Sequence, residues 1–231
     1  MWSRYPAPGH REVGPHRVVV VRRVVMVGNS GSGKTTLAGA VATRLAVPHV
    51  ELDTHFHQRG WTPTPAREFV EAVRDALDTA DAHAGGWVVC GNYDAVRASI
   101  WARADTIVWL DLPRAVVMAR VTKRSARRVV GRTELWNGNR ESLSELLALH
   151  DADRSVIRWS WDGVVNYRAV LVPAMAGTTW GDLRWYRLRS AAAVQQWLAQ
   201  VAPPDRDDRP RPAGTTSGPA RPTRLPRRER R

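Results

Sequence analysis

Residues 28–35 read Gly28-Asn29-Ser30-Gly31-Ser32-Gly33-Lys34-Thr35 and match the phosphate-binding pattern G-x-x-x-x-G-K-[ST] at every fixed position. The apolar residues 24–27 before this stretch are typical of a buried strand, and residues 36–45 after it are typical of a helix. Strand, glycine-rich loop and helix in this order are the context in which the pattern binds a nucleotide. We therefore predict a nucleotide site here and not a chance turn.

Each residue type in this loop has a physical task. Glycines let successive backbone N–H groups point at phosphate oxygens, and the following helix adds the positive potential of its N-terminus. Lys34 can reach the β- and γ-phosphates, and the Thr35 hydroxyl can bind a metal ion, so we expect ATP and Mg²⁺ as cofactors with Thr35 as the metal ligand. The residues expected to hold the nucleotide are Gly28, Asn29, Ser30, Gly31, Ser32, Gly33, Lys34, Thr35 and Thr36.

Bulk properties narrow the class of protein. The chain has 231 residues, which suits one α/β domain with extensions, and no apolar run approaches the ~20 residues of a membrane helix. Its single cysteine, Cys90, excludes an internal disulfide and a cysteine-rich metal site. Because the N-terminus also lacks a signal-peptide pattern, we predict a cytoplasmic protein without a membrane partner.

The formal net charge of +13 raises the question of nucleic-acid binding. Residues 203–231 alone hold nine arginines against four acidic residues. Their many prolines predict a disordered tail, and a solvated tail is the simpler explanation of this charge. Nucleic acid is therefore an alternative partner that the sequence does not favour.

Apolar strand patterns alternate with helical patterns along the rest of the chain, which predicts an α/β fold with a parallel sheet covered by helices on both faces. Residues 1–20 and 203–231 are expected to be disordered around one domain at 21–202, and residues 155–177 fit no clean period. The further strands are predicted at 49–53, 87–90, 106–111 and 183–188, and the further helices at 66–82, 94–102, 114–129, 141–151 and 191–201.

Ligands of parallel sheets lie beyond the carboxyl ends of the strands. Three separate features are expected at that edge: the loop 28–35, Asp53 after the second strand, and Gly91-Asn92-Tyr93 after the third. Their convergence predicts one cleft, although Asp53 could instead cap the following turn. Asp111, after the fourth strand, is predicted to cap the next helix.

Further stretches accompany the loop, namely Glu51-Leu52-Asp53, Gly60-Trp61-Thr62-Pro63, Gly91-Asn92-Tyr93, Trp109-Leu110-Asp111-Leu112-Pro113 and Glu134-Leu135-Trp136-Asn137-Gly138-Asn139-Arg140-Glu141. With them the chain resembles, over residues 22–199, the adenylate-kinase-like branch of P-loop kinases, including bacterial proteins labelled adenylate kinase or DNA topology modulation protein. The resemblance implies a P-loop NTPase three-layer fold with a five-stranded parallel sheet, a helical lid at about residues 120–158, and phosphoryl transfer.

The resemblance also implies roles for single residues. Arg120 and Arg124 lie four apart on one helix face, where nucleotide kinases carry two lid arginines that grip phosphates, although a solvated helix face is an alternative. Asp53 resembles the carboxylate that contacts an acceptor hydroxyl or the magnesium shell. The expected catalytic residues are thus Lys34, Arg120, Arg124 and Asp53, and the expected acceptor-binding residues are Asp53, Gly91, Asn92, Tyr93 and Arg140.

One position departs from the related sequences, which carry an aspartate where this chain has Cys90. A neutral thiol is a poor ligand for Mg²⁺, which prefers hard oxygen donors. We expect an ATP-dependent phosphotransferase whose leading acceptor is a nucleoside monophosphate, with a small hydroxylated metabolite second. The alternative is a nucleotide-binding regulatory protein with little kinase activity, associated with DNA through its tail.

Overall fold

The structure is a computed structural model that describes residues 18–148, 151 and 155–202. The tail 203–231 and residues 1–17, which the sequence predicts to be disordered, lie outside the described residues. Within them, β1 (Val19–Val20) pairs in parallel with β7 (Val201–Ala202) in a small separate sheet. Residues 19 and 20 were expected to belong to the disordered N-terminal stretch, but they pair with a segment about 180 residues away, which no local pattern shows.

Five parallel strands form the central sheet in the order β3-β4-β2-β5-β6, which confirms the predicted fold class. All five strands end at the same edge of the sheet, where a ligand of such a fold is expected. The strands are β2 (Arg23–Gly28), β3 (His49–Glu51), β4 (Trp87–Cys90), β5 (Thr106–Leu110) and β6 (Arg184–Leu188).

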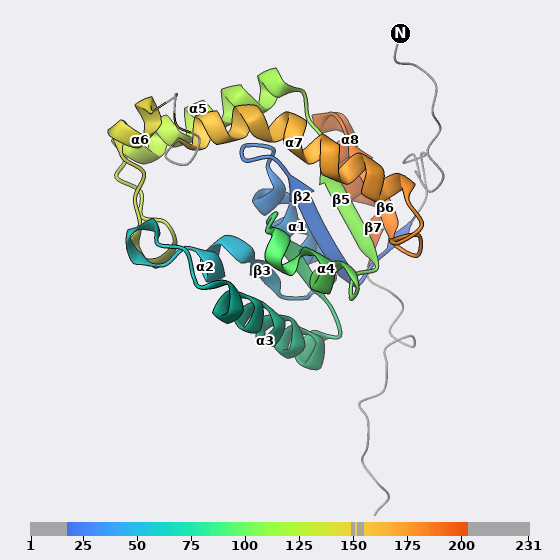
Figure 1. Cartoon of the computed structure of the whole chain (residues 1–231). Helices are drawn as coiled ribbons and strands as arrows, with labels where there is room; N and C mark the ends of the chain where they lie inside the picture. Colours follow the sequence, from blue (N-terminus) through green and yellow to red (C-terminus); the bar gives the residue numbers. More distant parts are fainter. Residues whose placement is uncertain (1–17, 149–150, 152–154, 203–231) are drawn as a thin grey trace, which may run out of the picture.

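Helices cover both faces of this sheet (Figure 1). Val24 and Met26 of β2 pack with α1 and α8, whereas the alternate residues Val25 and Val27 pack with α3, α4 and α7. Both sides of each central strand are buried, which explains why these strands are apolar throughout. The helices are α1 (Lys34–Leu45), α3 (Ala66–Ala84), α4 (Asp94–Trp101), α7 (Val156–Ala176) and α8 (Ala191–Gln200).

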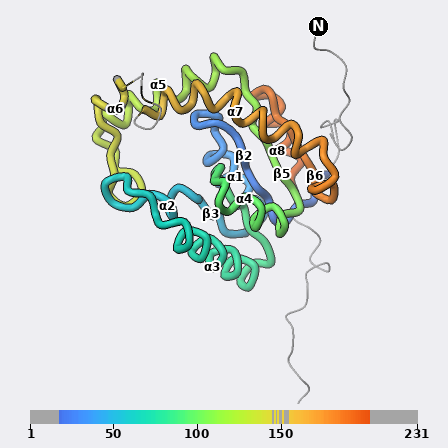
Figure 2. The backbone as a smooth tube through the Cα atoms, in the orientation of Figure 1, coloured from blue at the N-terminus to red at the C-terminus, as the bar shows by residue number. Residues whose placement is uncertain are grey.

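The remaining elements surround the carboxyl edge of the sheet. Figure 2 shows the backbone between α5 and α6 extending to α2, so that it spans two separate helical parts of the molecule. Among the described helices, none combines the length and the apolar character needed to cross a bilayer. These elements are α2 (Leu52–Phe56), η1 (Arg59–Trp61), α5 (Arg114–Val130), η2 (Trp136–Gly138) and α6 (Leu143–Leu147).

Several predicted elements differ from the structure in their bounds, and two of these differences are notable. The second strand ends at Glu51 and not at residue 53, because the chain turns directly into the short helix α2. The helix predicted at 141–151 covers only Leu143–Leu147 in the described residues. Asp53 therefore lies on α2, and Glu51 is the carboxylate at the end of the strand.

Helix α7 occupies the segment whose residues fit no clean period. Its buried positions include Ser160 and Gly163, which are not apolar and so hide the helical pattern. The small residues are needed because α7 lies close to the glycine-rich loop: a Cβ atom on Gly163 would come 2.7 Å from Asn29 Oδ1. Because the residues of α7 that approach the loop are small and not apolar, the sequence lacks the apolar pattern that would have predicted this helix.

The sequence predicted that Asp111 caps a helix, but the buried Asp111 carboxylate instead forms ion pairs with two arginines. Its Oδ1 accepts a hydrogen bond from Arg168 Nε at 2.8 Å, and its Oδ2 accepts one from Arg187 Nε at 2.9 Å. The Asp111 side chain is 4% exposed, and the helix that follows begins with Pro113 at its N-cap without a side-chain bond. Asp111 therefore joins α7 and β6 to the end of β5.

Replacing Asp111 with asparagine is expected to lower the free energy of unfolding by about 2 kcal/mol, because two arginines lose a charged acceptor. Urea unfolding followed by circular dichroism measures this change. Asp75→Asn is the matched control, since the Asp75 side chain is 70% exposed in its pair with Arg74 and is expected to matter by less than about 0.5 kcal/mol. Equal midpoints for the two variants would contradict a structural role of Asp111.

Candidate active site

The glycine-rich loop connects β2 to α1 and is shaped by its glycines. Gly33, the N-cap residue of α1, has φ of 95°, a conformation that favours glycine. The Ser32 N–H donates to the Asn29 carbonyl at 3.1 Å, which closes a tight turn in the loop. The free N–H groups at the start of the 12-residue helix α1 can therefore receive an anion.

Both predicted arginines of α5 reach this loop. Arg120 Nη1 donates to the Ser32 carbonyl at 3.2 Å, and Arg124 Nη2 donates to Ser30 Oγ at 2.8 Å. Burial and the nearby Arg128 lower the pKa of Arg124, while Glu141 and Asp53 act in the opposite direction. Both arginines therefore contact the loop, although Arg120 is exposed and Arg124 is half-buried.

Asn29 connects the loop to α7. Its Nδ2 donates to the Ser160 carbonyl at 2.5 Å, and its Oδ1 accepts from the Ser30 N–H at 2.8 Å. Asn29 is buried, and Gly163 leaves just enough room for its side-chain oxygen. The side chain of this predicted nucleotide residue is thus engaged in holding the loop against α7.

Gly163→Ala should weaken ATP binding about tenfold, because the added methyl group collides with Asn29 and displaces the loop. Isothermal titration calorimetry with ATP measures the effect. Gly39→Ala on α1 is the control, since no atom lies within 4 Å of the added Cβ atom and ATP affinity should stay unchanged. An unchanged affinity in Gly163→Ala would show that the loop does not depend on this contact.

At the acceptor edge, Asp53 and Tyr93 form a close pair. The Tyr93 hydroxyl donates to Asp53 Oδ1 at 2.5 Å and lies 3.4 Å from His57 Nε2. Burial first, and then the Asp53 charge, raise the pKa of Tyr93, so its hydroxyl remains a hydrogen-bond donor. The structure therefore brings together two of the predicted acceptor-binding residues.

The other predicted acceptor-binding residues have different surroundings. Asn92 braces the loop, since its Nδ2 donates to the Gly28 carbonyl at 2.6 Å and its Oδ1 accepts from the Gly28 N–H at 3.2 Å. A Cβ atom on Gly91 would lie 2.8 Å from Leu52 Cβ, so only glycine fits there. The Arg140 side chain is 54% exposed and paired with Glu134. Thr36 is exposed on the first turn of α1.

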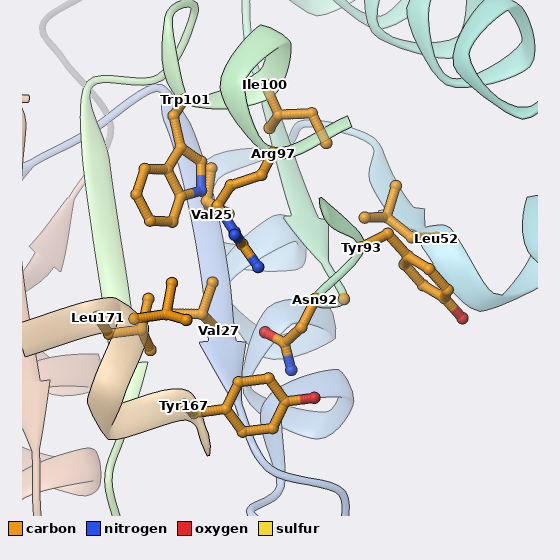
Figure 3. A pocket seen from close by; sticks show the side chains of 12 residues that line it. Val25, Val27, Leu52, Asn92, Tyr93, Arg97, Ile100, Trp101, Tyr167 and Leu171 are labelled. Atoms are coloured by element: carbon orange, nitrogen blue, oxygen red, sulfur yellow. The ribbon is translucent and has the colours of Figure 1, made fainter. Parts of the chain in front are cut away.

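A small cavity lies behind this edge, between α4 and α7 (Figure 3). Asn92, Arg97 and Tyr167 border it together with mainly apolar side chains. Figure 3 shows the Tyr93 hydroxyl pointing away from the cavity. The Tyr93 ring therefore lines the cavity, while its hydroxyl points away from the cavity and donates to Asp53.

Glu51 is a site residue that the sequence analysis missed. Its Oε1 accepts from the Thr35 hydroxyl at 3.2 Å, and its Oε2 accepts from the Trp136 indole N–H at 3.1 Å. A hydroxyl and a carboxylate side by side are hard oxygen donors, so Thr35 and Glu51 fit Mg²⁺. The end of the strand is the relevant signal in the sequence. If the strand had been predicted to end at residue 51, Glu51 would have been expected beside the loop.

Cys90 lies beneath these oxygen donors, with Sγ 3.8 Å from Thr35 Oγ1 and 3.2 Å from His49 Nε2. Burial, reinforced by Glu51, raises the pKa of the Cys90 thiol to about 12. The thiol therefore stays protonated at neutral pH and is unsuited to bind Mg²⁺. Glu51 supplies a carboxylate at this place instead.

Native protein at pH 8 is expected to resist alkylation of Cys90 by iodoacetamide, because the thiol is 1% exposed and its pKa is about 12. Mass spectrometry should detect no adduct after a time that fully modifies free cysteine. In urea, one adduct per chain should form, since the sequence has one cysteine. Rapid modification of the folded protein would contradict the buried, protonated thiol.

Comparison with known proteins supports the kinase interpretation of this geometry. Residues 30–157, more than half of the chain, match the shikimate kinase family model. The search of curated proteins finds no match. The predicted likeness to P-loop kinases is thus confirmed, while the narrower adenylate kinase label is not supported.

Several solved structures are similar to this chain. Shikimate kinase from Bacteroides thetaiotaomicron has 17% sequence identity and a TM-score of 0.41, and the match covers 78% of this chain and 96% of that chain. A gluconokinase from Sinorhizobium meliloti 1021 has 15% identity and a TM-score of 0.43, with coverage of 80% and 93%. Shikimate kinase from Acinetobacter baumannii in complex with shikimate has 14% identity and a TM-score of 0.44, with coverage of 78% and 90%. On the family match and the parallel sheet with its glycine-rich loop, the chain is an ATP-dependent P-loop kinase that belongs to the shikimate kinase family.

Proposed function

We propose that this protein transfers the γ-phosphoryl group of ATP to a hydroxyl group of a small hydroxylated metabolite. The observation that carries this proposal is the pair of carboxylates two residues apart. Glu51 contacts Thr35 at the phosphate loop, and Asp53 contacts Tyr93 at the acceptor edge. Such a pair can serve the nucleotide and the acceptor at the same time.

The nucleotide would lie on residues 28–36, with its triphosphate against the loop N–H groups and Lys34. Arg120 and Arg124 already contact the loop, so they can stabilise the charge that spreads over the transferring group. Residues 120–158 would form the lid, whose closure excludes water and protects ATP from hydrolysis. The contacts of Arg120 and Arg124 with the loop support the roles proposed for these two residues.

Thr35 and Glu51 would hold the magnesium ion, directly or through water. When bound, Mg²⁺ neutralises charge on the β- and γ-phosphate oxygens. Asp53 would orient the acceptor hydroxyl and accept its proton, while Tyr93 holds the carboxylate in place through its hydrogen bond. The protein thus positions a hydroxyl oxygen opposite the phosphoryl group and removes its proton.

The family match, together with the partners of four arginines, supports a hydroxylated metabolite over a nucleoside monophosphate as acceptor. A phosphate-bearing acceptor needs arginines directed at its own phosphate. Arg120 and Arg124 contact the loop, Arg128 pairs with Glu141, and Arg97 pairs with Asp94. The family model, that of shikimate kinase, also points to an acceptor with hydroxyl groups.

The test is an acceptor screen with Mg·ATP. Shikimate, gluconate, other polyols and nucleoside monophosphates are incubated separately, and ADP and phosphorylated products are measured by mass spectrometry. ADP formed in step with a phosphorylated polyol supports the proposal, and turnover confined to nucleoside monophosphates would overturn its acceptor. Tight ATP binding without any acceptor-dependent turnover would favour the regulatory alternative.

A further inference from the structure

Residues 136–139, which read Trp-Asn-Gly-Asn and are called the clasp here, join the segment after α5 to the loop of residues 57–63. Asn139 Oδ1 accepts from the N–H groups of Gly60 at 2.7 Å and Trp61 at 3.0 Å, and its Nδ2 donates to the residue 58 carbonyl at 2.8 Å. Asn137 Nδ2 donates to the His57 carbonyl at 2.5 Å. Asn139 is 4% exposed, so the clasp is built into the fold.

The clasp fixes the position of the Trp136 indole. The Trp136 ring stacks on His57 with 5.8 Å between ring centroids and 23° between planes. On its polar edge, the indole N–H donates to Glu51 Oε2 at 3.1 Å. The indole is therefore held by the 57–63 loop and holds a carboxylate in turn.

Glu51 is thus oriented from two directions, by Trp136 at Oε2 and by Thr35 at Oε1. A glutamate side chain at the end of a strand has several rotatable bonds, and only some of its conformers point an oxygen at Thr35. The indole N–H is a donor only, so it stabilises the ionised carboxylate. This hydrogen bond selects one conformer of Glu51 before any nucleotide arrives.

We propose that Trp136 is a positioning residue for the metal site: it holds Glu51 so that the carboxylate faces Thr35 and the Mg²⁺ of Mg·ATP. This inference rests on the proposed function, which assigns Mg²⁺ to Thr35 and Glu51. Because the clasp is anchored on the loop that follows Asp53, it connects the metal site to the acceptor side. In this role, no residue of the clasp needs to contact the nucleotide.

The test compares ATP affinity in excess Mg²⁺ with ATP affinity in EDTA, by calorimetry on the full chain. Trp136→Phe keeps an aromatic ring beside His57 but lacks the N–H group. We expect the ratio of the two affinities to fall about tenfold, as when an outer-shell partner of a metal ligand is lost, with the affinity in EDTA unchanged. Trp61→Phe is the matched control, because Trp61 belongs to the same ring cluster but its indole donates to the Arg140 carbonyl, and its ratio should equal that of the wild type.

A double-mutant cycle assigns the effect to Glu51. In a Glu51→Gln background, Trp136→Phe should change the ratio no further, since both changes remove the same arrangement. Trp136→Leu is a second variant that also lacks the donor, and thermal unfolding verifies that each variant is folded. If folded Trp136→Phe and Trp136→Leu had the same ratio of affinities as the wild type, the inference would be overturned but the proposed metal site would not. If the wild-type protein bound ATP equally well in Mg²⁺ and in EDTA, the metal site and the inference would both be overturned.

Discussion

Lys34→Ala is expected to lower kcat about a thousandfold and to weaken ATP binding, because the loop loses its one ammonium group. Lys34 is half-buried on the first turn of α1, and among the described residues it forms no ion pair. Its charge is therefore available to phosphate oxygens and is not spent on a carboxylate. Steady-state kinetics with the acceptor found in the screen, together with ATP calorimetry, measure both losses.

The chain offers a close control for this prediction. Lys123, its second lysine, is exposed on α5, and Lys123→Ala should change kcat and ATP affinity by less than about twofold. Lys34→Arg should not restore activity, since a planar guanidinium does not replace a compact ammonium group inside a close-fitting loop. Near-normal turnover in Lys34→Ala would mean that the phosphates do not lie on this loop.

The elements that the sequence predicted well are those whose signal is local. The β2 strand, the glycine-rich loop and α1 are contiguous, and each carries its own pattern of apolar residues or glycines. Strand β4 was predicted with its exact bounds because it is buried on both faces and ends at Gly91. The helix predicted at 191–201 begins at Ala191, directly after Ser190, whose Oγ accepts from the Ala193 N–H at 3.1 Å.

The features that the sequence did not predict depend on contacts between distant residues. Asp111 pairs with arginines 57 and 76 positions away, so nothing near it in the sequence distinguishes it from a helix cap. Helix α7 was missed because its contact with the glycine-rich loop requires Ser160 and Gly163, where a helix normally shows apolar residues. The contact of Glu51 with Thr35 depends on where β3 ends, and strand ends are poorly determined by pattern alone.

Asp53→Asn should lower kcat at least a hundredfold and leave ATP affinity nearly unchanged, because it removes a proton acceptor at the acceptor edge and not a loop contact. The variant keeps its shape, and the Tyr93 hydroxyl can still donate to the asparagine oxygen that replaces Asp53 Oδ1. A loss of turnover can therefore be attributed to the missing charge and not to a disrupted fold. Single-turnover phosphoryl transfer and ATP calorimetry on the same preparation measure the two quantities.

Two further variants distinguish the role of the Asp53 carboxylate from that of the Tyr93 hydroxyl that holds it in place. Tyr93→Phe keeps the Asp53 carboxylate but removes its hydrogen-bond donor, so a loss of about tenfold is expected, smaller than that of Asp53→Asn. Asp94→Asn is the neighbouring control, since the Asp94 side chain is 83% exposed in its pair with Arg97. Should Asp53→Asn retain full turnover while its melting temperature falls, the carboxylate would have only a structural role in α2, and another group would accept the proton of the acceptor. Because Lys34→Ala loses ATP binding and Asp53→Asn keeps it, the two variants together distinguish a failed nucleotide site from a failed acceptor site.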